Sequence, residues 1–250
     1  MTKKPSEFYV GYLALPPGLR WVLGGLVVLL AILVALDAWL VASFQPEAGT
    51  GKWGQTPREF VGTLSRAPYP SLRVRENDAV RTYVLISDEK RSSDRELGSI
   101  ADGASIKVSG YEIERAAVGM IQLVGTGADI TLASGVPSIS KEPRELHGRT
   151  ELKGEIVDSK CWLGVMRPGD GHIHKACASL CIRGGIPPMF VVRGGDGPQV
   201  YLLTLFDGSA VPPQAILDYV ADPVSLAGVV EKRGDVFLFK ADLATLKRTQ

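Results

Sequence analysis

All three cysteines and two of the three histidines of this 250-residue chain fall in one short segment, 154–192. Thiolates and imidazoles are the usual protein ligands of zinc and copper(I), and thiols also form disulfides or act as redox groups. Chance does not explain such a concentration of reactive side chains. We therefore expect this segment to bind a metal ion, form a disulfide or act as a redox group.

A helix is predicted for residues 174–183 (HKACASLCIR), which are rich in helix formers and are followed by a glycine pair. His174, Cys177 and Cys181 are offset by three and then four residues. At 3.6 residues per turn these side chains project from one face of a helix. His172 would point to the opposite side.

A metal site with four protein ligands follows from this alignment. Cys161 comes just after a predicted strand, and a loop rich in Gly and Pro allows it to reach the face that carries His174, Cys177 and Cys181. Three thiolates and one imidazole are a common tetrahedral set for zinc, and four protein ligands make such a site structural. Copper(I) is the alternative metal. Asp158 is placed to hydrogen-bond the ligand histidine.

Two other interpretations of the cysteines stay open. In an oxidising compartment Cys161 would form a disulfide with Cys177 or Cys181, which leaves one thiol free and the metal absent. A bridge between Cys177 and Cys181 would be strained, because residues one helical turn apart rarely meet disulfide geometry. A thiol-redox enzyme ranks third, since the spacing is C-x-x-x-C and not the reactive C-x-x-C. The metal is preferred because His174 joins the same face.

The segment 154–192 also resembles a domain found in uncharacterised bacterial envelope proteins, through the pattern G-x-I-x-D-S-x-C followed by H-x-x-C-A-x-x-C. The resemblance implies an exported β domain and brings no established activity. It implies a Cys/His site on Asp158, Cys161, His174, Cys177 and Cys181.

A membrane anchor is predicted for residues 21–44, a run of about the 20 apolar residues that a bilayer core requires. The basic residues Lys3, Lys4 and Arg20 precede it, so residues 1–20 would be a cytoplasmic lead and the rest would lie in the periplasm of a bacterium, held at the inner membrane. A signal peptide cleaved near 41–43 is the competing interpretation. The apolar run is longer than the usual signal-peptide core, which favours an uncleaved anchor.

The remainder of the chain is predicted to be all-β, in two OB-like small barrels at 58–133 and 150–250. Linkers are expected at 45–57 and 134–149. The two halves show a similar order of strand-like runs, and Gly154 stands in its first run where Gly62 stands in the other. The second barrel would carry the short helix with the Cys/His site.

A formal net charge of +1 argues against nucleic-acid binding, which needs clustered cations. No nucleotide-binding glycine loop or hydrolase motif was found, so no catalytic or cofactor-binding residue is assigned. We expect a non-catalytic accessory or assembly subunit of an envelope complex, possibly redox-linked, whose partners are the membrane and other membrane or periplasmic subunits. The alternatives are a metal- or thiol-dependent redox enzyme and a periplasmic metal-handling protein.

Overall fold

The computed structural model of the chain describes residues 16–44, 51–77, 79–115, 118–125, 129–134, 143–194 and 197–249. These residues are mostly β, with a closed five-strand barrel, a second sheet and a few helices. Parts of three predicted segments lie outside the described residues, namely the lead 1–20 and the linkers 45–57 and 134–149.

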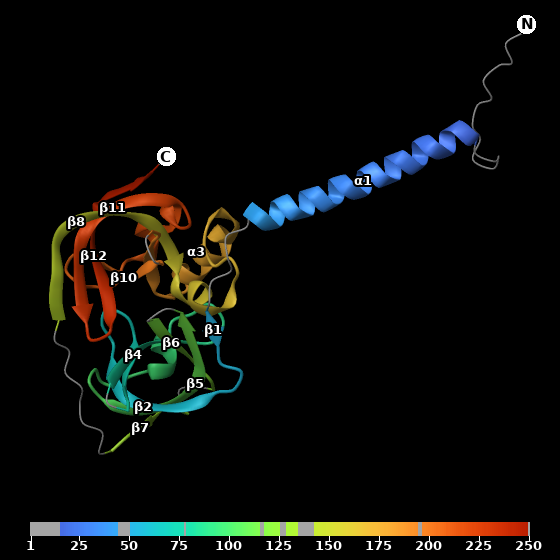
Figure 1. The fold of residues 1–250 in the computed structure, drawn as a ribbon. Coiled ribbons are helices and arrows are strands. Elements are labelled where there is room, and N and C mark those ends of the chain that lie inside the picture. The colour runs from blue at the N-terminus through green and yellow to red at the C-terminus, as the bar shows by residue number, and fades with distance from the viewer. Residues whose placement is uncertain are drawn as a thin grey trace, which may run out of the picture. The chain divides into compact units, whose positions relative to one another are not determined.

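The N-terminal helix α1 spans Pro17–Phe44, and Figure 1 shows it as a continuous rod. Proline suits the first position of a helix because the amide it lacks has no partner there. Within Gly18–Phe44, a window of 18 residues reaches a mean hydropathy of 2.6. At 1.5 Å per residue they extend about 40 Å, which exceeds a bilayer core of about 30 Å. The helix is therefore long and apolar enough to span a membrane or to act as a signal anchor.

The first β part comprises strands β1–β7 and the short helix α2. Its elements are β1 (Lys52–Trp53), β2 (Arg58–Ser65), β3 (Ser71–Glu76), β4 (Ala79–Ile86), α2 (Asp94–Leu97), β5 (Ser105–Arg115), β6 (Val118–Leu123) and β7 (Thr131–Leu132). The sheet runs in the order β1-β5-β2-β3-β4-β6, and β6 pairs with β5 as well. Strands β2 to β6 therefore form a closed cycle of pairings.

The second β part is the closed barrel β10-β12-β11-β8-β9. Its elements are β8 (Pro143–Asp158), α3 (Lys175–Arg183), β9 (Pro188–Val192), β10 (Gln199–Leu205), β11 (Pro223–Arg233) and β12 (Val236–Arg248), with short helical turns between them. Strand β8 begins at Pro143, inside the predicted linker 134–149, because its first residues pair with the end of β11. Helix α3 confirms the helix predicted for 174–183.

Both β parts connect their strands in the same pattern. With β2 and β8 counted as the first strands, each first strand pairs with the second and the fourth: β2 with β3 and β5, and β8 with β9 and β11. The third strand pairs in parallel with the fifth, β4 with β6 and β10 with β12. Gly62 on β2 and Gly154 on β8 occupy equivalent positions in the two parts. A Cβ on Gly62 would lie 2.3 Å, and one on Gly154 would lie 2.4 Å, from a carbonyl oxygen of the next strand. Gly110 on β5 and Gly228 on β11 correspond in the same way, since a Cβ on them would lie 2.6 and 2.5 Å, respectively, from a carbonyl oxygen of the next strand. Such glycines mark sharp bends of a closed sheet.

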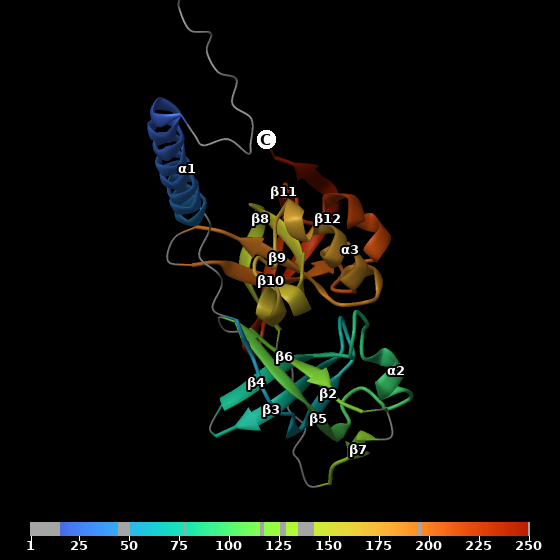
Figure 2. The ribbon, with the colours of Figure 1, turned by 90° about the vertical axis from the view of Figure 1, so that its right-hand side faces the viewer.

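The two β parts belong to one compact unit, residues 48–250, and Figure 2 shows them stacked one above the other. One hydrophobic cluster contains side chains of both, including Val84 and Met120 from the first and Trp162 and Met189 from the second. The phenol of Tyr69 donates a hydrogen bond of 2.7 Å to the carbonyl of a residue in β10 and accepts one of 3.1 Å from a backbone amide. Cys161 and Cys181 also belong to this shared core.

Candidate metal centre

Cys161 is positioned by the end of strand β8. The chain leaves β8 at Asp158 and enters a short π-helical turn, Cys161–Val165. The Oδ1 atom of Asp158 accepts a hydrogen bond of 2.8 Å from the backbone amide of Cys161, as a residue that caps a helical turn does. Cys161 is 6% exposed and belongs to the shared hydrophobic cluster.

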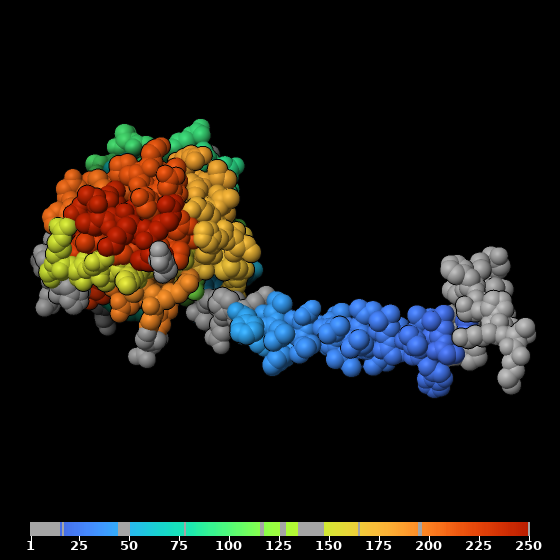
Figure 3. Space-filling model, turned by 90° about the horizontal axis from the view of Figure 1, so that it is seen from above, coloured from blue at the N-terminus to red at the C-terminus, as the bar shows by residue number. Residues whose placement is uncertain are grey.

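Helix α3 supplies the other two thiols. Cys181 is buried and Cys177 is half-buried, one turn apart on the same side of the helix. His174 ends a short helical turn just before α3 and is also buried. His172 leaves this face as the spacing predicts, because 78% of its side chain is exposed. In the space-filling view the gold surface of this segment lies beside the red and orange surface of β11 and β12 (Figure 3).

The three thiols meet in one place. Their sulfur atoms all lie within 4.8 Å of one another, and 3.9 Å separates Sγ of Cys161 from Sγ of Cys177. A disulfide bond measures about 2.05 Å, so the three thiols are free. Two thiolates bound to one tetrahedral zinc, each at about 2.3 Å, stand about 3.8 Å apart by simple geometry. The observed separation is therefore close to that of a shared metal ion.

His174 belongs to a second, overlapping group, which consists of Asp158, Cys161 and His174. Its Nε2 atom lies 3.1 Å from Oδ2 of Asp158, as expected for a carboxylate that orients an imidazole. Cys161 is common to both groups. Of the four residues proposed from the sequence as ligands, the structure thus gathers the three thiols and holds His174 next to one of them.

Lys90 is a member of the site that the sequence did not indicate. It lies in the loop between β4 and α2, in the first β part, and its Nζ atom is 2.8 Å from Sγ of Cys177 and 3.6 Å from Sγ of Cys181. A second amine is close by, since Lys160 donates a hydrogen bond of 2.5 Å to the carbonyl of Glu89 in the same loop. Nothing in the sequence links Lys90 to cysteines about 90 positions away.

The glycine pair after α3 allows this loop to approach. A Cβ on Gly184 would lie 1.8 Å from the carbonyl oxygen of Lys90, and one on Gly185 would lie 2.9 Å from Cβ of Ser92. The amide of Ser92 also donates a hydrogen bond of 3.1 Å to the carbonyl of Gly184. The pair therefore ends the helix, as predicted, and also leaves room for the loop that carries Lys90.

The charges of the site favour a thiolate at Cys181 and oppose one at Cys161. The hydrogen bond between Cys161 and Cys181 raises the pKa of Cys161, which burial raises further, and it lowers the pKa of Cys181. The hydrogen bond to Cys177 raises the pKa of Lys90, whereas burial lowers the pKa of Lys160. Sulfur anions held next to an ammonium can bind a soft metal ion or take part in thiol exchange.

No protein-family model matches the sequence, and no curated protein matches it. Among solved structures, the chain is similar to one described as the crystal structure of the tetrameric p202 HIN2, with 7% identity and a TM-score of 0.21. The alignment covers 82% of this chain and 100% of that chain. A TM-score this low supports no conclusion about fold or function, so the function is argued from the site.

Proposed function

We propose that this chain is a membrane-anchored envelope protein whose second β part holds a metal ion on the thiolates of Cys161, Cys177 and Cys181. The observation that carries the proposal is the gathering of three free thiols within 4.8 Å of one another. Two of them are almost fully buried. Free thiols in such a cluster would oxidise in an exported protein unless a bound ion protected them.

Zinc is the metal we propose, with copper(I) as the alternative. Three thiolates on Zn²⁺ leave a net charge of −1, which the ammonium of Lys90 at 2.8 Å from Cys177 balances. His174 is the candidate for the fourth ligand: its Nε2 is hydrogen-bonded to Asp158, and its Nδ1 would be the atom that binds the ion. A closed set of four protein ligands would make the site structural.

The place and orientation in the cell are part of the proposal. Helix α1 is long and apolar enough to cross a bilayer. The basic residues Lys3, Lys4 and Arg20 on its N-terminal side favour a cytoplasmic N-terminus, with the β parts in the bacterial periplasm. We propose an uncleaved anchor in the inner membrane.

We also propose that the two β parts are OB-like barrels that arose by duplication. Support comes from the shared order of strand pairing, which includes the parallel pair of third and fifth strands, and from the matched glycines. A buried metal in a duplicated, anchored scaffold fits a non-catalytic accessory or assembly subunit of an envelope complex. Its partners would be other membrane or periplasmic proteins.

Metal analysis of the purified full chain tests the proposal. Prepared in detergent without chelators, the protein should contain one zinc ion per chain, and X-ray absorption should give zinc–sulfur distances of about 2.3 Å. Cys177→Ser should lose the metal, and His172→Ala, which changes an exposed residue outside the group, should keep it. A metal-free protein with one free thiol after denaturation without reductant would refute the proposal and would establish a disulfide.

A thiol-redox activity is the second candidate function, favoured by Lys90 at 2.8 Å from the half-buried Cys177. An ammonium next to a thiol favours the nucleophilic thiolate. The partner for a disulfide would be Cys161, whose sulfur is 3.9 Å away. A metal-free chain that cycles reversibly between three thiols and one, at a defined potential, would favour this function over the structural metal.

A further inference from the structure

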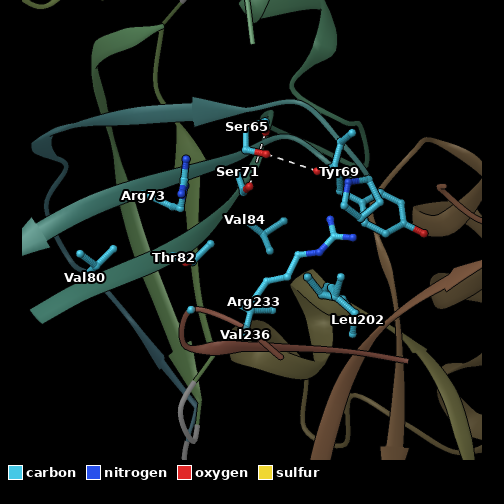
Figure 4. Close-up of a pocket in the computed structure, with 14 residues that line it drawn as sticks. Ser65, Tyr69, Ser71, Arg73, Val80, Thr82, Val84, Leu202, Arg233 and Val236 are labelled. Carbon is cyan, nitrogen blue, oxygen red and sulfur yellow. Dashed lines mark hydrogen bonds between the residues drawn. The ribbon is translucent and has the colours of Figure 1, made fainter. Parts of the chain in front are cut away.

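A cavity of about 200 Å³ lies between the two β parts, and its lining includes none of the three cysteines. Strands β3 and β4 of the first part form one wall. The ends of β10 and β12 and the turn between β11 and β12 form the other. Figure 4 shows the side chains that line it, with Arg73 on β3 and Arg233 extending from the end of β11 toward Tyr69.

Hydrogen bonds connect the two walls of the cavity. Both carboxylate oxygens of Asp235 accept hydrogen bonds, of 3.0 and 3.1 Å, from the backbone amide of Thr82. The hydroxyl of Tyr69 joins the opposite end of the cavity to the second β part through its two hydrogen bonds. The cavity is thus part of a fixed interface within one compact unit.

Arg73 is the unusual member of the wall. Strand alternation turns its neighbours Leu72 and Val74 into the core of the first β part, so Arg73 faces the second β part, where docking leaves it only 8% exposed. Its Nε and Nη1 atoms are buried without a hydrogen-bond partner among the residues that the structure describes. The hydroxyl of Thr82, opposite Arg73 in the β3–β4 pairing, also has no partner there.

A buried guanidinium with two unpartnered nitrogen atoms is costly for the folded state. Burial lowers the pKa of Arg73, and the one carboxylate that opposes this effect electrostatically is that of Asp102. Guanidinium groups match carboxylates, which accept two parallel hydrogen bonds from them. A guanidinium that lines a cavity and has unpartnered nitrogen atoms is suited to bind an anionic ligand.

The rest of the lining is apolar, chiefly Val84 from the first β part and Leu202, Val236 and Leu238 from the second. Three of these four residues are less than 5% exposed, and Leu202 is 7% exposed. An apolar cavity of about 150 Å³ is known to hold benzene. The space between the β parts therefore fits a body of one aromatic ring with a small substituent.

We propose that this cavity binds a small aromatic carboxylate, with the carboxylate on the guanidinium of Arg73 and the ring against Val84, Leu202 and Leu238. The hydroxyl of Thr82 adds a donor to the same carboxylate, and Arg233 closes the side toward Tyr69. Because every wall residue comes from a strand or turn at the interface, the bound acid also bridges the two β parts. The site does not depend on the thiols or on a metal.

Equilibrium dialysis of the full chain in lipid nanodiscs, with benzoate as the probe, tests the proposal. Benzamide supplies the ring without the charge, and acetate supplies the carboxylate without the ring. Benzoate should bind saturably, at one site per chain and at least tenfold more tightly than either. Equal binding of benzoate and benzamide, equal binding of benzoate and acetate, or no saturable binding of benzoate would overturn the assignment.

Two variants locate the site. Arg73→Met should weaken benzoate binding at least tenfold. Ser71 also lines the cavity, so Ser71→Leu should do the same by filling the space while it leaves the guanidinium in place. Arg75→Met is the matched control, because Arg75 lies two residues along the same strand but is exposed. Its benzoate affinity should equal that of the original chain. If Arg73→Met and Arg75→Met weaken benzoate binding equally, the binding depends on surface charge and the proposal is refuted.

Protein stability separates binding from a structural role. Since Arg73 has unpartnered polar atoms, Arg73→Met should unfold at a temperature no lower than that of the original chain, and benzoate should raise this temperature for the original chain alone. If Arg73→Met fails to fold, Ser71→Leu decides the question by itself. A folded Ser71→Leu protein that binds benzoate with unchanged affinity would exclude this cavity.

Discussion

The contact between Gly184 and the loop that carries Lys90 gives the sharpest test of how the thiol site is assembled. The backbone of Gly184 has φ −77° and ψ −3°, which any residue adopts without strain. Replacing glycine by alanine in such a conformation stabilises a protein by about 0.4–1 kcal/mol when there is room for the methyl group, because the unfolded chain loses freedom. Space alone therefore decides the sign of the effect.

There is no room at this position. The new Cβ would lie 1.8 Å from the carbonyl oxygen of Lys90, and an ordinary contact begins at 3.4 Å, so the loop must retreat by about 1.6 Å. That shift would lengthen the 3.1 Å hydrogen bond from Ser92 to Gly184 beyond bonding distance and would withdraw Lys90 from Cys177. Overpacking of this kind costs about 1–3 kcal/mol. Gly184→Ala should lower the free energy of unfolding by that amount.

Urea denaturation of the full chain in detergent, followed by tryptophan fluorescence, measures this change. Gly148→Ala is the matched control, since a Cβ there meets nothing within 4 Å, and its free energy of unfolding should stay the same or rise by up to about 1 kcal/mol. Gly184→Ala should also slow the alkylation of Cys181, because the hydrogen bond to Cys161 and the charge of Lys90 lower the pKa of this thiol and the variant withdraws Lys90. If Gly184→Ala is as stable as Gly148→Ala and its thiols react at the original rate, the loop does not hold Lys90 on the site.

Three further predictions concern single side chains. The pKa of Cys181 is lowered by its hydrogen bond to Cys161 and by the charge of Lys90, so Lys90→Met should raise this pKa and slow alkylation of Cys181 at neutral pH; an unchanged pH profile in an iodoacetamide assay would contradict this. His174→Ala should cost about 1–3 kcal/mol in chemical denaturation, because it leaves Oδ2 of the buried Asp158 without its hydrogen-bond partner, whereas His172→Ala should stay within about 0.5 kcal/mol. At Asp222, burial raises the pKa, but hydrogen bonds from two cations outweigh it and the net pKa is lowered. The contribution of Asp222 to stability is therefore present above the unfolded-state pKa of about 4 and is lost as the pH falls through the lower folded-state pKa. The difference in unfolding free energy between the original chain and Asp222→Asn should shrink on acidification below pH of about 4. A difference that stays constant would count against the ion pairs of Asp222.

The sequence by itself determined the features that depend on local spacing. The offset of four residues between Cys177 and Cys181 predicts the helical turn that α3 places between them, whereas His174 ends the turn before α3 and groups with Asp158 and Cys161. His172 leaves that face as expected. The apolar run at 21–44 predicts the helix observed from Pro17 to Phe44. Helical periodicity and hydropathy act over one or a few turns, so the residues involved are neighbours in the sequence and their relation can be read directly.

Only the tertiary structure decided which distant groups complete these local features. By strand alternation Arg73 and Arg75 are alike, and both would be expected to face water; docking of the second β part buries Arg73 and leaves Arg75 exposed. Lys90 reaches Cys177 because the glycine at 184 admits its loop, a contact between positions 87 residues apart. Sequence spacing carries no signal for such contacts, since they depend on how two closed sheets pack and not on the period of either.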